Sequence, residues 1–280
     1  MQGYTAASLI VLKPISVSQK IAIIGGGNLG TAIAQGLIKS DFCNPADITI
    51  TKRNISTLKG ELPKTVKITD DNVKAASGSD VIILAVKPFQ VEGVMKTIAP
   101  VLHKKQVLIS VITGVTVSDL KEMAQIALPV FRAMPNTAVA IQESMTCISY
   151  DNATERQVQT VTKMFNTVGK VAVIDDKLMD AATVLGACGT AFALRYVRAN
   201  IQGGIEIGFD AKTASLIAAQ TVKGAAELLL SNNTHPEQEI DKVTTPKGCT
   251  IVGLNEMEHR GFSSSLIRGV ITSYKKIAKD

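Results

Sequence analysis

The sequence predicts an α/β domain built on a doubly wound parallel sheet, followed by an all-α domain. Between about residue 20 and residue 175, short apolar runs alternate with amphipathic stretches, which is typical of parallel strands covered by helices on both faces. After Asp175-Asp176 the strand-like runs stop, and the chain is rich in Ala, Leu and Ile with helical spacing. Hydrophobic residues make up 46% of the 280 residues and aromatic residues only 4%. The core is therefore expected to be aliphatic, as in buried parallel sheets and closely packed helices.

The expected strands are short apolar or β-branched runs. They span 21–24, 47–51, 66–68, 80–86, 106–111, 146–149 and 171–174. Helices are expected over 29–39, 178–231, 250–260 and 263–277, with breaks at Gly203-Gly204 and at Gly208-Phe209-Asp210, where Asp210 can cap the next helix. We therefore expect an N-terminal extension over 1–18, an α/β domain over 19–175 and an all-helical domain over 176–280.

The composition excludes several classes of function. The net charge is +6, but the Lys and Arg residues are scattered and form no nucleic-acid-binding motif. The four cysteines are far apart, so neither a zinc site nor a disulfide framework is expected, and reduced thiols favour a cytoplasmic protein. No apolar run reaches the length of a membrane span, so no membrane partner is expected. A basic surface suits a phosphorylated cofactor and a small-molecule carboxylate substrate.

A glycine-rich loop lies between the first strand and the first helix. Gly25-Gly26-Gly27-Asn28-Leu29-Gly30 matches G-x-G-x-x-G in the strand–turn–helix context that the motif requires. Gly25 permits the tight turn, Gly27 lets the backbone approach a pyrophosphate, and Gly30 lets helix and strand pack closely. The helix N-terminus would hold the anion. The loop thus predicts a Rossmann dinucleotide-binding unit and an oxidoreductase; the alternative is a glycine-rich turn without a ligand.

The end of the second strand indicates which dinucleotide is bound. Enzymes that use NAD generally place Asp or Glu there for the ribose hydroxyls. This chain has Thr51-Lys52-Arg53-Asn54 and no acid. Lys52 and Arg53 are suited to a 2′-phosphate, which favours NADPH over NADH. The alternative is a pair of solvated surface cations.

Two more turns are expected to face the cofactor, because ligands of open α/β sheets bind beyond the carboxyl ends of the strands. The first is Ala85-Val86-Lys87-Pro88, and the second contains Thr113. An ordinary strand-to-helix turn is the alternative for the second.

Several segments resemble the pyrroline-5-carboxylate reductase family, which catalyses the last step of proline biosynthesis. They are IAIIGGGNLGTAIAQGL (21–37), SDVIILAVKP (79–88), FRAMPNTA (131–138) and HPEQEIDKVTTPKGCTIVGLNEMEHRGFSSSLI (235–267). The last is the most specific, because it is similar to the family's signature around a Ser-Pro-Gly-Gly-x-Thr loop. The resemblance implies a Rossmann domain, an all-helical domain that dimerises, and hydride transfer from NAD(P)H to the imine carbon of a cyclic substrate, which gives L-proline. A homodimer or a multiple of dimers is expected, and the Ala-rich helix over 211–230 favours it independently.

The resemblance also implies roles for individual residues. Thr250 would hydrogen-bond the imine nitrogen and assist its protonation. Substrate-binding residues would be Thr245, Gly248, Cys249, Thr250 and Asp176. Asn136 would contact the cofactor near the nicotinamide and Asn72 near the adenosine. The loop over 244–250 suits this role physically, because N–H groups and Thr hydroxyls at a helix start can hold a carboxylate. Plain helix capping by Thr245 or Thr250 is the alternative.

The chain departs from the family pattern at three places. Gly186 to Phe192 stands in place of the family's Ser-Gly-Ser-Gly-Pro-Ala-Tyr, Lys242 replaces an Asn, and Lys247 replaces the first Gly of the Gly-Gly pair. Two alternatives to the proline-forming reaction therefore stay open. One is a β-hydroxyacid-type dehydrogenase, although Arg195 stands near the place of its catalytic Lys. The other is a catalytically impaired dinucleotide-binding paralogue.

Overall fold

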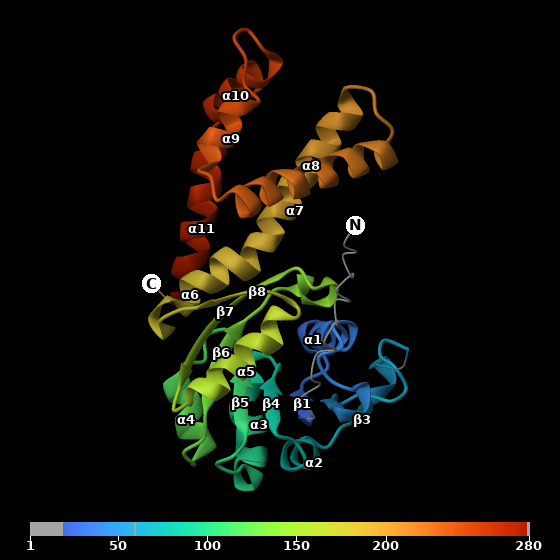
Figure 1. Ribbon diagram of the computed structural model, residues 1–280, viewed down its shortest axis with the longest axis vertical. Coiled ribbons are helices and arrows are strands. Elements are labelled where there is room, and N and C mark those ends of the chain that lie inside the picture. Colours follow the sequence, from blue (N-terminus) through green and yellow to red (C-terminus); the bar gives the residue numbers. More distant parts are fainter. Residues whose placement is uncertain (1–18, 59, 279–280) are drawn as a thin grey trace, which may run out of the picture. The chain divides into compact units, whose positions relative to one another are not determined.

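The computed structural model describes residues 19–58 and 60–278, so the extension expected over 1–18 lies outside the described residues. The chain divides into two compact units, of which one ends at Asp176 and the other begins at Lys177. The first is an α/β unit, here called the sheet unit, and the second is the helical unit (Figure 1).

The sheet unit is built on eight strands in the order β3-β2-β1-β4-β5-β6-β7-β8. The strands are β1 Ile21–Ile24, β2 Ile48–Thr51, β3 Lys67–Thr69, β4 Val81–Leu84, β5 Val107–Ser110, β6 Val130–Met134, β7 Ser144–Asp151 and β8 Gly169–Val173. Strands β1 to β6 are parallel, with the order reversal of a doubly wound sheet between β1 and β4. The predicted fold class is thus confirmed.

One junction differs from the parallel pairing expected from the sequence. Strand β7 runs antiparallel to β6, and β8 pairs parallel with β7. The connection from β6 to β7 passes only through the short 3-10 helix η5, Thr137–Ile141. Because a parallel crossover needs a dozen or more residues, usually including an α-helix, this short connection returns the chain in the opposite direction.

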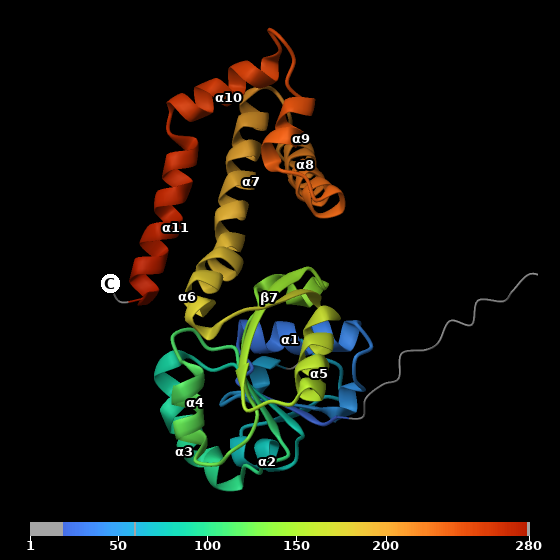
Figure 2. The ribbon, with the colours of Figure 1, turned by 60° about the vertical axis from the view of Figure 1, so that its left-hand side comes forward.

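Helices cover both faces of the sheet (Figure 2). They are α1 Asn28–Lys39, α2 Asn72–Ser77, α3 Val91–Ile98, α4 Val117–Ala124 and α5 Glu155–Asn166. Helices α1 and α5 pack on one face through residues such as Leu37 and Phe165. Helices α2, α3 and α4 pack on the other through residues such as Met95 and Leu120. Because both faces are covered, the four residues of β1 are all fully buried, which explains its unbroken apolar sequence.

The helical unit contains α6 Met179–Ala182, α7 Gly189–Glu206, α8 Ala211–Asn232, α9 Pro236–Lys242, α10 Cys249–His259 and α11 Phe262–Ala278. Asp210 caps α8 as expected, accepting hydrogen bonds from the backbone N–H groups of Lys212 and Thr213 at 3.0 and 3.1 Å. The break expected at Gly203-Gly204 is wrong, because α7 continues through both glycines to Glu206. Thr183–Cys188 forms a π-helical turn, η7, between α6 and α7.

The continuous helical segment Asp176–Glu206 is long and apolar enough to cross a membrane by length and composition alone. From the sequence, no apolar run of transmembrane length was expected. Core helices of soluble proteins pass the same test, but only 17% of the apolar window is buried within this chain. Burial within this chain therefore does not account for the apolar surface of this segment.

Candidate active site

The sheet unit gathers the predicted cofactor residues at one edge. Thr51, Ile24, Leu84 and Ser110 lie side by side in the register of β2, β1, β4 and β5, and each is the last residue of its strand. The predicted residues follow the carboxyl ends of β1 to β6: Gly25, Gly27, Asn28, Leu29, Gly30, Lys52, Arg53, Asn72, Ala85, Val86, Lys87, Pro88, Thr113 and Asn136. Residues spread over more than 100 positions thus meet at the carboxyl edge of one parallel sheet, where open α/β sheets bind ligands.

The glycine loop is fixed to the neighbouring strands by its backbone. The N–H of Gly26 donates to the carbonyl oxygen of Thr51 at 2.6 Å, and that of Gly25 donates to Thr51 Oγ1 at 3.1 Å. Gly25 has φ +114°, and a Cβ there would lie 2.7 Å from the Ala85 carbonyl oxygen. A Cβ on Gly30 would lie only 2.1 Å from the carbonyl oxygen of Gly25. Neither position has room for a side chain, so the loop and α1 pack against each other through bare backbone.

Gly27 differs from the two other motif glycines, because a Cβ built on it meets nothing within 4 Å. Gly27 is exposed and is the N-cap of α1, whose first turn has no side-chain cap and no acidic residue. The open space therefore faces free N–H groups and the positive end of the helix dipole. This arrangement fits a pyrophosphate, which needs both a close backbone approach and unpaired N–H donors.

The end of β2 is basic, as the sequence indicated. The Lys52 backbone is held by its N–H, which donates to the Thr69 carbonyl oxygen at 3.0 Å. The side chain of Arg53 is exposed, and neither Lys52 nor Arg53 belongs to an ion pair within the described residues. Asn54 turns into its own loop, where its Oδ1 accepts a hydrogen bond from Ser56 Oγ at 2.6 Å. The two cations are thus available to a phosphate.

The turns after β3, β4 and β6 are held by local hydrogen bonds. Asp71 caps α2 by accepting from the Lys74 N–H at 2.9 Å, which places Asn72 at the first position of the helix. The Lys87 N–H donates to Gln90 Oε1 at 3.2 Å. Asn136 Oδ1 accepts from the Ala138 N–H at 3.0 Å and so caps η5. These bonds fix the shape of the edge without a ligand.

A buried charged cluster lies at the same level of the sheet as the last residues of β1, β2, β4 and β5. It was not predicted from the sequence. Arg132 in β6 is 3% exposed, and its Nη1 donates to Asp176 Oδ1 at 3.0 Å. Ser149 Oγ in β7 donates to the same carboxylate oxygen at 2.6 Å. Arg132 is in register with Ser110 on one side and Ser149 on the other. The carboxylate of Asp176, predicted to bind substrate, is therefore already engaged by two protein groups. An Arg inside an otherwise apolar strand was the signal that could have revealed it.

The predicted substrate loop lies wholly within the helical unit. Thr245 to Gly248 form a β-turn, in which the Gly248 N–H donates to the Thr245 carbonyl oxygen at 2.9 Å. Gly248 is the N-cap of α10 and has no side-chain cap. Capping by Thr245 or Thr250 is therefore wrong, and neither hydroxyl has a hydrogen-bond partner among residues 19–58 and 60–278. The loop thus presents two hydroxyls and the first N–H groups of α10 without protein partners.

The fold and the site together define a dinucleotide-dependent oxidoreductase, with a Rossmann sheet unit followed by a helical unit. Comparison with known proteins assigns it to a family. A family model described as pyrroline-5-carboxylate reductase dimerisation matches residues 176–280, and one described as NADP oxidoreductase coenzyme F420-dependent matches residues 20–114.

Individual relatives agree with these matches. Pyrroline-5-carboxylate reductase 2 of Dictyostelium discoideum is 40% identical over an alignment of 288 positions, gaps included, which covers 96% of this chain and 96% of that protein. Pyrroline-5-carboxylate reductase 1 of the same organism is 43% identical over 270 residues, but the chain spans only 49% of its length. The crystal structure of Plasmodium falciparum pyrroline carboxylate reductase with NADP bound is 25% identical, with a TM-score of 0.85 over 92% of this chain and 97% of that one. The chain belongs to the pyrroline-5-carboxylate reductase family.

Proposed function

We propose that the chain reduces 1-pyrroline-5-carboxylate to L-proline with NADPH. The observation that carries the proposal is the 40% identity to a pyrroline-5-carboxylate reductase along 96% of both chains. The geometry supports it, because the sheet unit offers an edge suited to a dinucleotide and the helical unit offers a loop suited to a carboxylate. The domain assignments follow: residues 19–175 bind the cofactor, and residues 176–280 bind substrate and dimerise.

In this proposal the sheet unit binds and orients the cofactor. The α1 N-terminus beside Gly27 holds the pyrophosphate, and Lys52 and Arg53 hold the 2′-phosphate. The turns at Ala85–Pro88 and Thr113, together with Asn136, line the nicotinamide side, and Asn72 lines the adenosine side. When bound, the reduced nicotinamide supplies the hydride. Orientation of donor and acceptor is then the main catalytic contribution of the protein.

The helical unit holds the substrate in this proposal. The reaction adds a hydride to the imine carbon and a proton to the imine nitrogen, so the C=N double bond becomes a C–N single bond. The N–H groups after Gly248 and the Thr245 hydroxyl bind the carboxylate, and the Thr250 hydroxyl hydrogen-bonds the nitrogen. A Thr hydroxyl is a poor acid near neutral pH, so the proton comes through water or arrives on an already protonated imine.

Turnover distinguishes this function from its alternatives. The purified chain should oxidise NADPH when the pyrroline substrate is added, and it should reduce NADP+ slowly with L-proline at alkaline pH. Oxidation of a β-hydroxyacid instead would point to a dehydrogenase of that type. Binding of NADPH without turnover of either substrate would point to an impaired paralogue.

The cofactor preference is tested by removing the two cations at the end of β2. Lys52→Gln/Arg53→Gln should raise the KM for NADPH about tenfold or more, because two charge-assisted contacts to the 2′-phosphate are lost. The KM for NADH should change less than twofold, since NADH lacks that phosphate. Lys104→Gln/Lys105→Gln, in the turn before β5, removes the same two charges elsewhere on the surface and is the control for net charge. Wild-type kcat/KM that is higher with NADH would contradict the preference.

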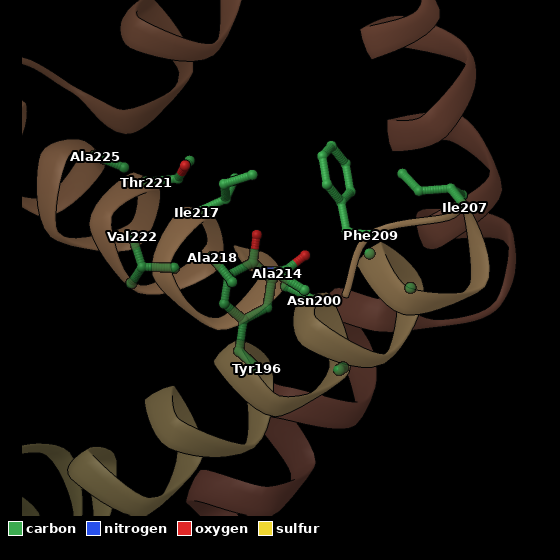
Figure 3. A pocket seen from close by; sticks show the side chains of 13 residues that line it. Tyr196, Asn200, Ile207, Phe209, Ala214, Ile217, Ala218, Thr221, Val222 and Ala225 are labelled. Atoms are coloured by element: carbon green, nitrogen blue, oxygen red, sulfur yellow. The ribbon is translucent and has the colours of Figure 1, made fainter. Parts of the chain in front are cut away.

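The helical unit matches the family's dimerisation region, and we propose a homodimer, or a multiple of dimers, in the cytoplasm. A groove of about 590 Å³ lies between α7 and α8, lined by apolar side chains such as Tyr196, Ile217 and Phe209 (Figure 3). A second copy that covers these faces accounts for the exposed apolar surface of Asp176–Glu206 without a membrane. Sedimentation should show a dimer at micromolar concentration without detergent; a monomer would contradict the proposal.

A further inference from the structure

The β-turn before α10 carries an unusual residue at its third position. Lys247 has φ +60°, a left-handed conformation that costs an L-residue free energy and that Gly adopts freely. Five other described non-glycine residues are left-handed, and all are Asp, Asn or Gln that follow the end of a helix or strand. Pro at the second position and a left-handed third position are typical of a turn that favours Gly third. The local backbone therefore gives no reason for a lysine.

In the described part of the chain, the side chain of Lys247 is an unpaired cation within the proposed substrate loop. It is exposed, and among the described residues it has no ion-pair or hydrogen-bond partner. The nearest lysine along the chain, Lys242, is by contrast paired with Glu239 at 2.8 Å. The segment 243–250 contains no acidic residue. A full positive charge thus stands next to Gly248, where the partial positive charge of the α10 N-terminus begins.

We propose that Lys247 is a specificity-determining residue that forms an ionic contact with the substrate carboxylate. The inference rests on the proposed function, because it concerns the substrate of that same loop. A flexible ammonium suits this role, since it adds a point charge without competing for the backbone N–H geometry. The residue selects cyclic imines that carry a carboxylate over imines that lack one.

Two substitutions of Lys247 separate charge from backbone conformation. Lys247→Gln removes the charge and keeps the strained left-handed residue, whereas Lys247→Gly removes both. At low ionic strength, both variants should raise the KM for 1-pyrroline-5-carboxylate about fivefold, the value of one solvent-exposed ionic contact near 4 Å. The kcat should stay within about twofold. The difference in KM should disappear near 0.5 M salt, where such a contact is screened.

The melting temperature and the KM for a second substrate distinguish loss of the ionic contact from a change in the structure of the loop. Lys247→Gly should raise the Tm, because glycine adopts the left-handed backbone conformation of this position without strain. A higher KM in this variant would then not result from a destabilised fold. Neither variant should raise the KM for 1-pyrroline, which lacks the carboxylate. Lys104→Gln removes the same charge at the amino end of β5 and should leave both KM values unchanged.

The possible results distinguish failure of the proposed role of Lys247 from failure of the proposed function. A KM for the carboxylate substrate that rises less than twofold in Lys247→Gln, or that rises equally for 1-pyrroline, overturns the role of Lys247. In that case the wild-type chain still reduces 1-pyrroline-5-carboxylate, and the proposed function stands. A wild-type chain that turns over neither substrate overturns the proposed function itself, and the assay of the unaltered protein shows this separately.

Discussion

Gly30→Ala should be the most damaging single-methyl change in the glycine loop. The added Cβ would lie 2.1 Å from the backbone carbonyl oxygen of Gly25 and 3.2 Å from Cγ2 of the buried Ile23 side chain. Ordinary van der Waals contact begins near 3.4 Å, so α1 must move away from the loop by about 1 Å. Overpacking of this kind costs about 1–3 kcal/mol. We expect the upper half of that range, because the opposing group is backbone.

Two other glycines serve as controls for this prediction. Gly93→Ala places a methyl in open space on the exposed side of α3 and should stabilise the protein by about 0.5–1 kcal/mol. Gly27→Ala also meets nothing within 4 Å, so it should cost less than about 1 kcal/mol as an N-cap change. It nevertheless fills the proposed pyrophosphate space and should weaken NADPH binding at least tenfold.

The assay is urea unfolding followed by circular dichroism, at one protein concentration because oligomerisation contributes to stability. Titration with NADPH provides the second measurement. Gly30→Ala should lower both the stability and the affinity for NADPH. Gly27→Ala should lower only the affinity for NADPH, and Gly93→Ala should lower neither. If the free energy of unfolding of Gly30→Ala lies within about 0.5 kcal/mol of the wild-type value, α1 does not pack against the Gly25 carbonyl group as closely as described.

Two further predictions concern charges in the sheet unit. Asp176→Asn should cost about 2–3 kcal/mol, because it removes the negative charge that faces Nη1 of the buried Arg132 side chain. Asp151→Asn breaks an ion pair of half-exposed side chains with Lys121 and should cost less than about 1 kcal/mol. Equal melting temperatures for the two variants would refute the distinction. Burial raises the pKa of the Cys43 thiol from 9.0 to about 11. The unfolded chain therefore loses this proton first, and stability should fall by at most about 1.4 kcal/mol per pH unit between those two values. Cys43→Ala should flatten that fall, and an unchanged slope would contradict the assignment.

The sequence predicted local structure well in both units where a short segment determines its own conformation. The buried strand over 21–24 is β1 without change, and α1 begins within one residue of its expected start. Asp210 was expected to cap a helix and does so. The antiparallel return at β7 could not be found in this way, because the direction of a strand depends on the connection and not on its own residues.

The parts that were missed depend on contacts distant in sequence. Strand β6 contains Arg132, which interrupts its apolar pattern, and the reason for that Arg lies in Asp176 and Ser149, far along the chain. Gly203-Gly204 looked like a break, but Ala214 of α8 packs 3.2 Å from the position of a Cβ on Gly204, so the glycine serves close helix packing. Pairs of this kind become visible only in three dimensions.

The charged cluster also determines where this protein can be divided. Strand β8 ends at Val173, which pairs with Ile148, and three residues later the carboxylate of Asp176 contacts Arg132 in β6 and Ser149 in β7. Asp176 is thus the last residue of the sheet unit, and the helical unit begins at Lys177. A sheet unit produced by itself should keep its stability if it retains Asp176. A boundary drawn at 175, as the sequence alone indicates, would remove a carboxylate that contacts a buried arginine.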